Sequence, residues 1–323
     1  MKTLRLFAHR PFVLWKSAAG TQEDGRVPGP IHNAQGVALI LTLMVLSILT
    51  AMIVEFSYGI YINTSALYNW QTAQRLSLVA SSGLKLASKM ISEYATEYPY
   101  TYPGVVDETY QSPLEDSGEA ISIRVEDENS KLNLNYVVFA NGKLNEPAFL
   151  VLVRLLQILD LDPKMADRIV DWIDPDLEPR LPDSEKGSKN AKLDSVNEIL
   201  LIPAIERSAY ERLAPFITIY GSGQININGA QIPLLMSFSD AIDAGMAERI
   251  VGYRDNTPFE KPEDILKVAG FETIGQSLMG RITVKGTAFR VTSTAAAGDT
   301  KRIIETILDM PGGNPFVKYW VEF

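Results

Sequence analysis

The fold is decided by residues 36–54, GVALILTLMVLSILTAMIV. No residue between Val37 and Val54 carries a charge. As a helix, at about 1.5 Å per residue, this segment spans roughly 27 Å, close to the ~30 Å hydrocarbon core of a bilayer. Five basic residues precede it and the next follows only at Arg75. The positive-inside rule therefore predicts a cytoplasmic N-terminus and a body on the other side of the membrane.

A periodic apolar stripe continues this helix beyond the membrane segment. Apolar residues recur every three or four positions: Leu67, Trp70, Ala73, Leu76, Ala80, Gly83 or Leu84, Ala87, Met90 or Ile91, and Tyr94. We therefore predict one helix over Val37 to Glu97, with residues 37–62 in the membrane and residues 63–97 packed on a globular head. A cleaved secretory signal and an ordinary single-pass anchor are the alternatives; a signal usually has a shorter apolar core and a small-residue cleavage site.

The composition limits the chemistry of the body. Apolar residues make up 46% of the 323 residues and charged residues 21%, enough for one or two globular cores. There is no cysteine, and the two histidines, His9 and His32, precede the anchor. Nucleophilic catalysis by cysteine or by a serine–histidine pair is thus excluded from the body, and any metal there needs oxygen ligands. A net charge of −9 disfavours nucleic acid. We expect a component of an assembly and not an enzyme.

The body contains an internal repeat. Met165–Val170 (MADRIV) recurs as Met246–Val251 (MAERIV). Three shorter pairs follow the same order: Asn133–Asn135 with Asn226–Asn228, Glu198–Leu200 with Asp264–Leu266, and Ile217–Ile219 with Ile282–Val284. We predict two copies of one unit, residues 131–221 and 224–286, together a helical domain at 131–286. Prolines punctuate its short helices, which favours helix-hairpin-helix or SAM-like packing.

Alternating apolar residues on either side of this domain predict strands. The predicted strands are Ala120–Val125, Ala288–Thr294, Arg302–Leu308 and Val317–Phe323. The first belongs to the stretch at 98–130 and the other three to the stretch at 287–323. The expected fold is α+β: a long N-terminal helix packed on an antiparallel sheet, with the large duplicated helical domain inserted in the sheet.

Gly36, immediately before the apolar run, resembles the processing signal of type IV pilins and type II secretion pseudopilins. The resemblance implies that a prepilin peptidase removes residues 1–36 as a cytoplasmic leader, so that Val37 becomes the N-terminus, and it also implies methylation. The fifth mature residue is Leu41, where most members of these families have glutamate. That glutamate neutralises the terminal amine of a neighbouring subunit inside the apolar fibre core.

In lacking this glutamate, the sequence resembles the K-type minor pseudopilins of type II secretion. Four stretches agree with that subtype: Lys131–Asn135, Asp171–Asp176, Ser195–Leu200 and Ile225–Asn228. The resemblance implies a subunit at the tip of the pseudopilus in the bacterial inner membrane, with its body in the periplasm. It further implies that I-type and J-type minor pseudopilins are partners in beginning assembly, and that the subunit promotes export by contacts with secreted protein and the outer-membrane channel.

Three other functions stay open as alternatives. A minor pilin or tip protein of a type IV pilus has a similar fold. A membrane-tethered carboxylate hydrolase needs a cleft with paired carboxylates. A membrane-tethered DNA receptor needs a basic face, which the acidic body does not supply.

The first copy carries an acidic loop that the second copy lacks. Its carboxylates are Asp174, Asp176, Glu178, Asp183 and Glu185. Four of them match positions 1, 3, 5 and 12 of an EF-hand, but Pro179 replaces the glycine that such a loop needs. Carboxylates this close repel one another unless a cation intervenes, and the K-type resemblance implies calcium in the head. We predict a calcium site here; a solvated acidic loop is the alternative.

Overall fold

The computed structural model describes residues 34–111, 119–310 and 315–323. Contacts divide the chain into two units at Ser65 and Ala66. The helix α1 runs from Ala34 to Glu97, 64 residues, so the predicted single long helix is confirmed and begins slightly earlier than Val37.

Among the described residues, the first unit is the apolar part of α1. In the described part of the chain, this helix is long and apolar enough to cross a membrane. Three of its hydroxyl side chains are satisfied locally. Thr42, Ser47 and Thr50 each donate a hydrogen bond of 2.8 Å to a carbonyl of the preceding turn. Such bonds keep these three hydroxyls paired in an apolar surrounding.

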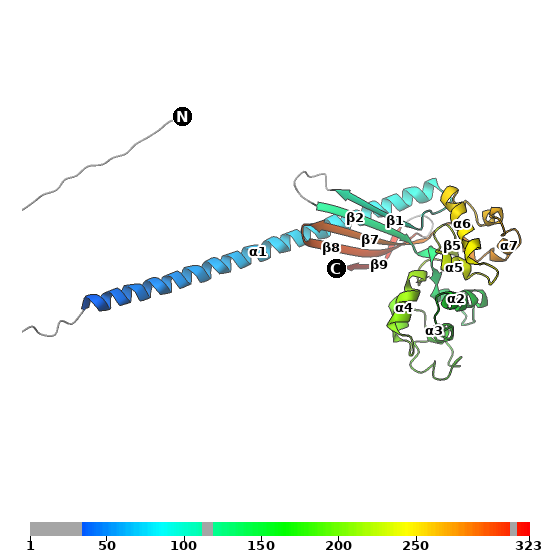
Figure 1. Cartoon of the computed structure of the whole chain (residues 1–323), viewed down its shortest axis with the longest axis horizontal. Helices are drawn as coiled ribbons and strands as arrows, with labels where there is room; N and C mark the ends of the chain where they lie inside the picture. Colours follow the sequence, from blue (N-terminus) through cyan, green and yellow to red (C-terminus); the bar gives the residue numbers. More distant parts are fainter. Residues whose placement is uncertain (1–33, 112–118, 311–314) are drawn as a thin grey trace, which may run out of the picture. The chain divides into compact units, whose positions relative to one another are not determined.

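The second unit contains a sheet of five antiparallel strands in the order β1-β2-β7-β8-β9 (Figure 1). Their bounds are β1 Val105–Gln111, β2 Glu119–Asp127, β7 Ala288–Ala297, β8 Thr300–Asp309 and β9 Phe316–Glu322. The second half of α1 packs on this sheet through its predicted stripe. Leu76 and Ala80 lie in one apolar cluster with Ile304 of β8, while Ala87 and Ile91 lie in a second cluster further along.

The four predicted strands are all present, but β1 was missed. Its sequence, VVDETYQ, places Asp107 and Glu108 in the middle and lacks the alternation that identifies a half-buried strand. The helical domain therefore lies between the second and third strands of the sheet. The prediction that it follows the first strand was wrong.

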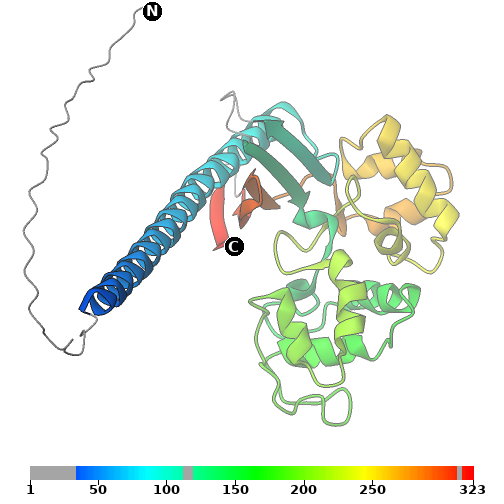
Figure 2. The same ribbon diagram turned by 60° about the vertical axis from the view of Figure 1, so that its left-hand side comes forward.

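The inserted domain consists of short helices and two-residue strands around one continuous core. Its α-helices are α2 Glu146–Ile158, α3 Met165–Ile173, α4 Arg207–Leu213, α5 Ile232–Met236, α6 Ala244–Asn256 and α7 Ile274–Leu278. Its strands are β3 Leu132–Asn133, β4 Ile217–Thr218, β5 Ile225–Asn226 and β6 Ile282–Thr283. Figure 2 shows the two groups of helices, green and yellow, side by side.

The repeat in the sequence is a repeat of hydrogen bonds in the structure. Each copy closes by pairing its first strand with its last in parallel, β3 with β4 and β5 with β6. In the first copy, the side-chain amide of Asn135 donates a hydrogen bond to the Leu193 carbonyl and accepts one from the Leu193 N–H. In the second copy, Asn228 makes the same two bonds to Phe259. The asparagines that reveal the repeat therefore hold the middle of each copy to the segment directly after its first strand.

Residues 127–130, Asp-Glu-Asn-Ser, join the inserted domain to the sheet, and we call them the joint. All four are buried although all four are polar. The Asn129 side chain accepts hydrogen bonds from the amides of Thr287 and Ala288, where the chain returns to the sheet. Glu128 forms ion pairs with Lys131 at 2.9 Å and with Arg290 at 3.0 Å. The two ends of the inserted domain are thus held together at one place.

Candidate metal centre

The helix α3 and the loop after it bring buried carboxylates together. The last turn of α3 carries Asp171, which is fully buried, and Asp174 follows as the C-terminal cap, 4% exposed. Asp171 organises the loop that returns past it. It accepts hydrogen bonds from the hydroxyl of Ser184 and, at 2.9 Å, from the amide of Arg180. The Arg180 guanidinium also lies 3.5 Å from Asp171 Oδ1.

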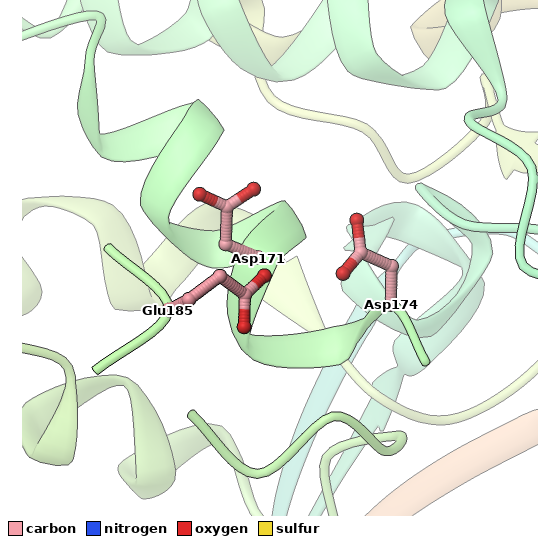
Figure 3. Close-up of side chains that lie close together, drawn as sticks. All are labelled: Asp171, Asp174 and Glu185. Carbon is pink, nitrogen blue, oxygen red and sulfur yellow. The ribbon is translucent and has the colours of Figure 1, made fainter. Parts of the chain in front are cut away.

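This loop places Glu185 beside the two aspartates. Asp171, Asp174 and Glu185 each offer a carboxylate oxygen, and among the described residues these oxygens lie within 4.8 Å of one another (Figure 3). Asp174 Oδ1, both Glu185 oxygens and Asn190 Oδ1 are buried and accept no hydrogen bond from the described part of the chain. Buried oxygens without donors are costly unless a cation binds them.

The electrostatics of the cluster favour a positive charge. Burial raises the pKa of Asp174 to about 7, and the negative charges of Asp176, Asp171 and Glu185 add to this effect. Burial, followed by the charges of Asp171 and Asp176, also raises the pKa of Glu185. A bound divalent cation offsets both the cost of burying these carboxylates and the repulsion between them. The donor set is all oxygen, which fits calcium or magnesium and not a soft metal.

The structure brings together two of the five carboxylates that the sequence singled out. Asp174 and Glu185 belong to the cluster. Asp176 lies near enough to raise the pKa of both, but it is exposed and accepts a hydrogen bond from the Glu178 amide at 2.9 Å. Glu178 and Asp183 are exposed, and Asp183 adopts a left-handed backbone with φ of 64°.

Sequence reasoning missed Asp171. It lies inside a helical repeat, next to Trp172, where a carboxylate is ordinarily a surface residue. One signal was available. Asp171 directly follows MADRIV in the first copy, whereas Gly252 directly follows MAERIV in the second, so only the copy with the acidic loop has an aspartate there.

The residues of the predicted cleavage site lie at the start of α1. Gly36 and Val37 are in its first turns, and Leu41 follows one turn later. Val37 is 60% exposed and Leu41 55% exposed in the isolated chain, so both are accessible for contacts with other molecules.

Comparisons with known proteins identify the family. The family model described as "Type II secretion system (T2SS), protein K" matches residues 130–222. A curated "Type II secretion system protein K" from Pseudomonas aeruginosa is 26% identical over 306 residues, covering 86% of this chain and 89% of the relative. The chain belongs to the protein K family of type II secretion minor pseudopilins.

Other members of the protein K family agree. The protein of that name from Dickeya chrysanthemi is 27% identical over 140 residues, 38% of this chain and 40% of the relative. A "Putative type II secretion system protein K" from Escherichia coli K12 is 24% identical, covering 61% and 66% of the two chains. These matches do not favour the type IV pilus alternative. Protein K is a structural component of the secretion apparatus.

A helix-hairpin-helix model and one solved structure support the fold. The helix-hairpin-helix motif matches residues 221–274, so the predicted packing is confirmed for the second copy. The solved chain comes from "the GspK-GspI-GspJ complex from enterotoxigenic Escherichia coli Type 2 Secretion System". The likeness has a TM-score of 0.64 at 17% identity and covers 78% of this chain and 97% of that one. The predicted α+β fold, with its long helix, antiparallel sheet and inserted helical domain, is confirmed.

Proposed function

We propose that this minor pseudopilin occupies the tip of the type II secretion pseudopilus, helps begin its assembly and promotes protein export across the outer membrane. The observation that carries the proposal is Leu41. A subunit with leucine there cannot neutralise the terminal amine of a neighbour in an apolar fibre core, where an unpaired charge costs several kcal/mol. At the tip this defect costs little, because no subunit lies ahead.

The inserted domain supports the same position. It lies in the connection between the neighbouring strands β2 and β7, which comprises residues 128–287. A head enlarged in this way is difficult to repeat along a closely packed fibre, whereas the end of a fibre accepts it. The similar solved chain was in complex with GspI and GspJ, and this supports I-type and J-type minor pseudopilins as partners here. Secreted protein and the outer-membrane channel are the further proposed contacts.

Immunogold labelling of pseudopili tests the tip position. Antibody against the inserted domain is expected to label fibre ends. Labelling distributed evenly along the fibres contradicts the proposal.

We further propose that a prepilin peptidase cuts between Gly36 and Val37, with the leader in the cytoplasm and the body in the periplasm. The apolar α1 with basic residues before it supports this orientation, and methylation of the processed chain is part of the same proposal. N-terminal sequencing of the membrane-extracted chain, with and without an active peptidase, is the decisive measurement. A mature N-terminus other than Val37 overturns the assignment.

Finally, we propose that Asp171, Asp174 and Glu185 bind calcium, with Asn190 Oδ1 as a further oxygen donor. When bound, the cation neutralises the clustered carboxylates. The protein residues supply the rest: Asp171 fixes the loop through Ser184 and the Arg180 amide, and thereby brings Glu185 to the aspartates. A cation that binds the folded state and not the unfolded state raises the free energy of unfolding by about 2.7 kcal/mol when its concentration is roughly 100 times its Kd.

Thermal unfolding with calcium, magnesium or chelator tests the site. Calcium is expected to raise the Tm of the wild-type chain and to leave the Tm of Asp171→Asn unchanged. Asp183→Asn, in the same loop but exposed, is the matched control and keeps the calcium response. A wild-type Tm that is the same in calcium and in chelator refutes the proposal.

A further inference from the structure

An apolar cavity of about 150 Å³ lies inside the head, between the end of α1, the loop at 101–104 and the first two strands. In Figure 1 this is where the cyan end of α1 passes β1 and β2. The cavity wall is hydrocarbon and aromatic, formed mainly by Met90, Ile91, Tyr94, Tyr110, Ile123 and Phe289. An apolar cavity of about this volume accommodates a single benzene ring.

Two acidic residues, Glu108 and Asp127, line this wall; Glu108 is exposed, whereas Asp127 is buried. Asp127 is 2% exposed and accepts hydrogen bonds from the Asn129 amide at 2.8 Å and from Asn226 Nδ2 at 2.6 Å. A carboxylate has about four lone-pair positions, so these two bonds leave acceptor capacity unused. Burial raises the pKa of Asp127 to about 7, and its two uncharged hydrogen-bond donors offset only part of this rise. A further donor from the cavity therefore stabilises the carboxylate.

The backbone is closely packed behind one wall of the cavity. Gly104 lies in that wall, and a Cβ atom added to it would lie 2.6 Å from the Cα of Gly229. The backbone segments here are already in closest approach and cannot move inward to fill the space. Met90 lies in the wall and is 40% exposed, so the cavity reaches solvent.

We propose that this cavity binds one aromatic ring that carries a hydrogen-bond donor, of the indole or phenol type. The ring lies among the apolar side chains, and its N–H or O–H donates to Asp127. Two sources share this chemistry: a free small aromatic molecule, and the side chain of a tryptophan or tyrosine in a partner. The cavity is separate from the metal centre, and the proposal does not depend on the position of the subunit in a fibre.

Calorimetric titration of the detergent-solubilised full chain with indole tests the proposal. Indole is expected to bind at least about tenfold more tightly than 1-methylindole, which has the same ring but no N–H, because a hydrogen bond to a charged group contributes at least that factor. N-acetyltryptophanamide separates the sources. If it binds as well as indole, the site admits a side chain of a partner; if only free indole binds, the ligand is a small molecule.

Two neighbouring residues of β1 provide a matched pair of variants. Val106 lines the cavity, whereas Val105 does not and is 45% exposed. Val106→Phe is expected to abolish indole binding by filling the space, while Val105→Phe keeps it. Binding that survives Val106→Phe in a folded chain, or the absence of indole binding to wild type, overturns the proposal. Equal affinities for indole and 1-methylindole also overturn it, whether or not the Val106 variant folds.

Discussion

Replacing Asn228 with alanine tests whether the repeated asparagines hold the inserted domain together. Asn228 is 1% exposed and lies at the start of the second copy. Its amide group donates to the Phe259 carbonyl and accepts from the Phe259 amide, each at 2.9 Å. Phe259 is itself fully buried. Alanine leaves both main-chain groups of Phe259 without a partner and out of reach of water.

The magnitude follows from these two bonds. A buried polar group left unpaired costs about 1–3 kcal/mol, so Asn228→Ala is expected to cost about 4 kcal/mol of unfolding free energy. Asn135→Ala breaks the equivalent pair to Leu193 in the first copy, but Asn135 is only partly buried. Water replaces part of what is lost there, and the cost is expected to be about half.

Urea unfolding followed by far-ultraviolet circular dichroism measures the stability, and amide exchange at residue 259 shows where it is lost. Asn141→Ala is the control, since Asn141 is exposed and accepts a single bond from the Lys143 amide. This control is expected to change stability by less than about 1 kcal/mol. If Asn228→Ala costs no more than Asn141→Ala, the Asn228 hydrogen bonds do not stabilise the domain.

Two further predictions concern the head. Asp127 has its pKa raised from 3.8 to about 7, so its contribution to stability is complete below pH 4 and is lost as the pH rises through 7. In unfolding experiments at constant calcium, the stability of wild type relative to Asp127→Asn should fall by up to about 4 kcal/mol between pH 4 and pH 8, and a constant difference contradicts the assignment. Gly83→Ala places a Cβ atom 2.6 Å from Ile121 Cδ1 and should lower the Tm. Gly59→Ala is the control and should leave the Tm unchanged, because no atom lies within 4 Å of the added Cβ. Equal Tm values for the two variants argue against close packing of α1 on the sheet.

Local patterns in the sequence predicted the features that local physics determines. The spacing of Leu76, Ala80 and Ala87 identified the face of α1 that packs on the sheet, because helical periodicity depends only on neighbouring residues. The Asn-x-Asn repeat identified the two copies, because the same hydrogen bonds recur in each.

The remainder depended on contacts between distant residues. Strand β1 carries charges at its centre and is recognisable mainly by its pairing with β2. Asp171 becomes part of the candidate site only because Ser184 and the Arg180 amide return to it along a folded loop. The sequence showed that the loop was acidic, but the choice among its carboxylates required the position of α3.

The joint at residues 127–130 makes the large domain a transferable module. Strands β2 and β7 are direct antiparallel neighbours, with Asp127 opposite Phe289, so the chain leaves the sheet and returns to it at adjacent positions. A short hairpin turn can in principle close that gap and restore an uninterrupted pilin-type sheet. For the same reason, duplication inside the domain enlarges the subunit without disturbing a strand register. The size of the inserted domain and the structure of the long helix and sheet can therefore evolve independently.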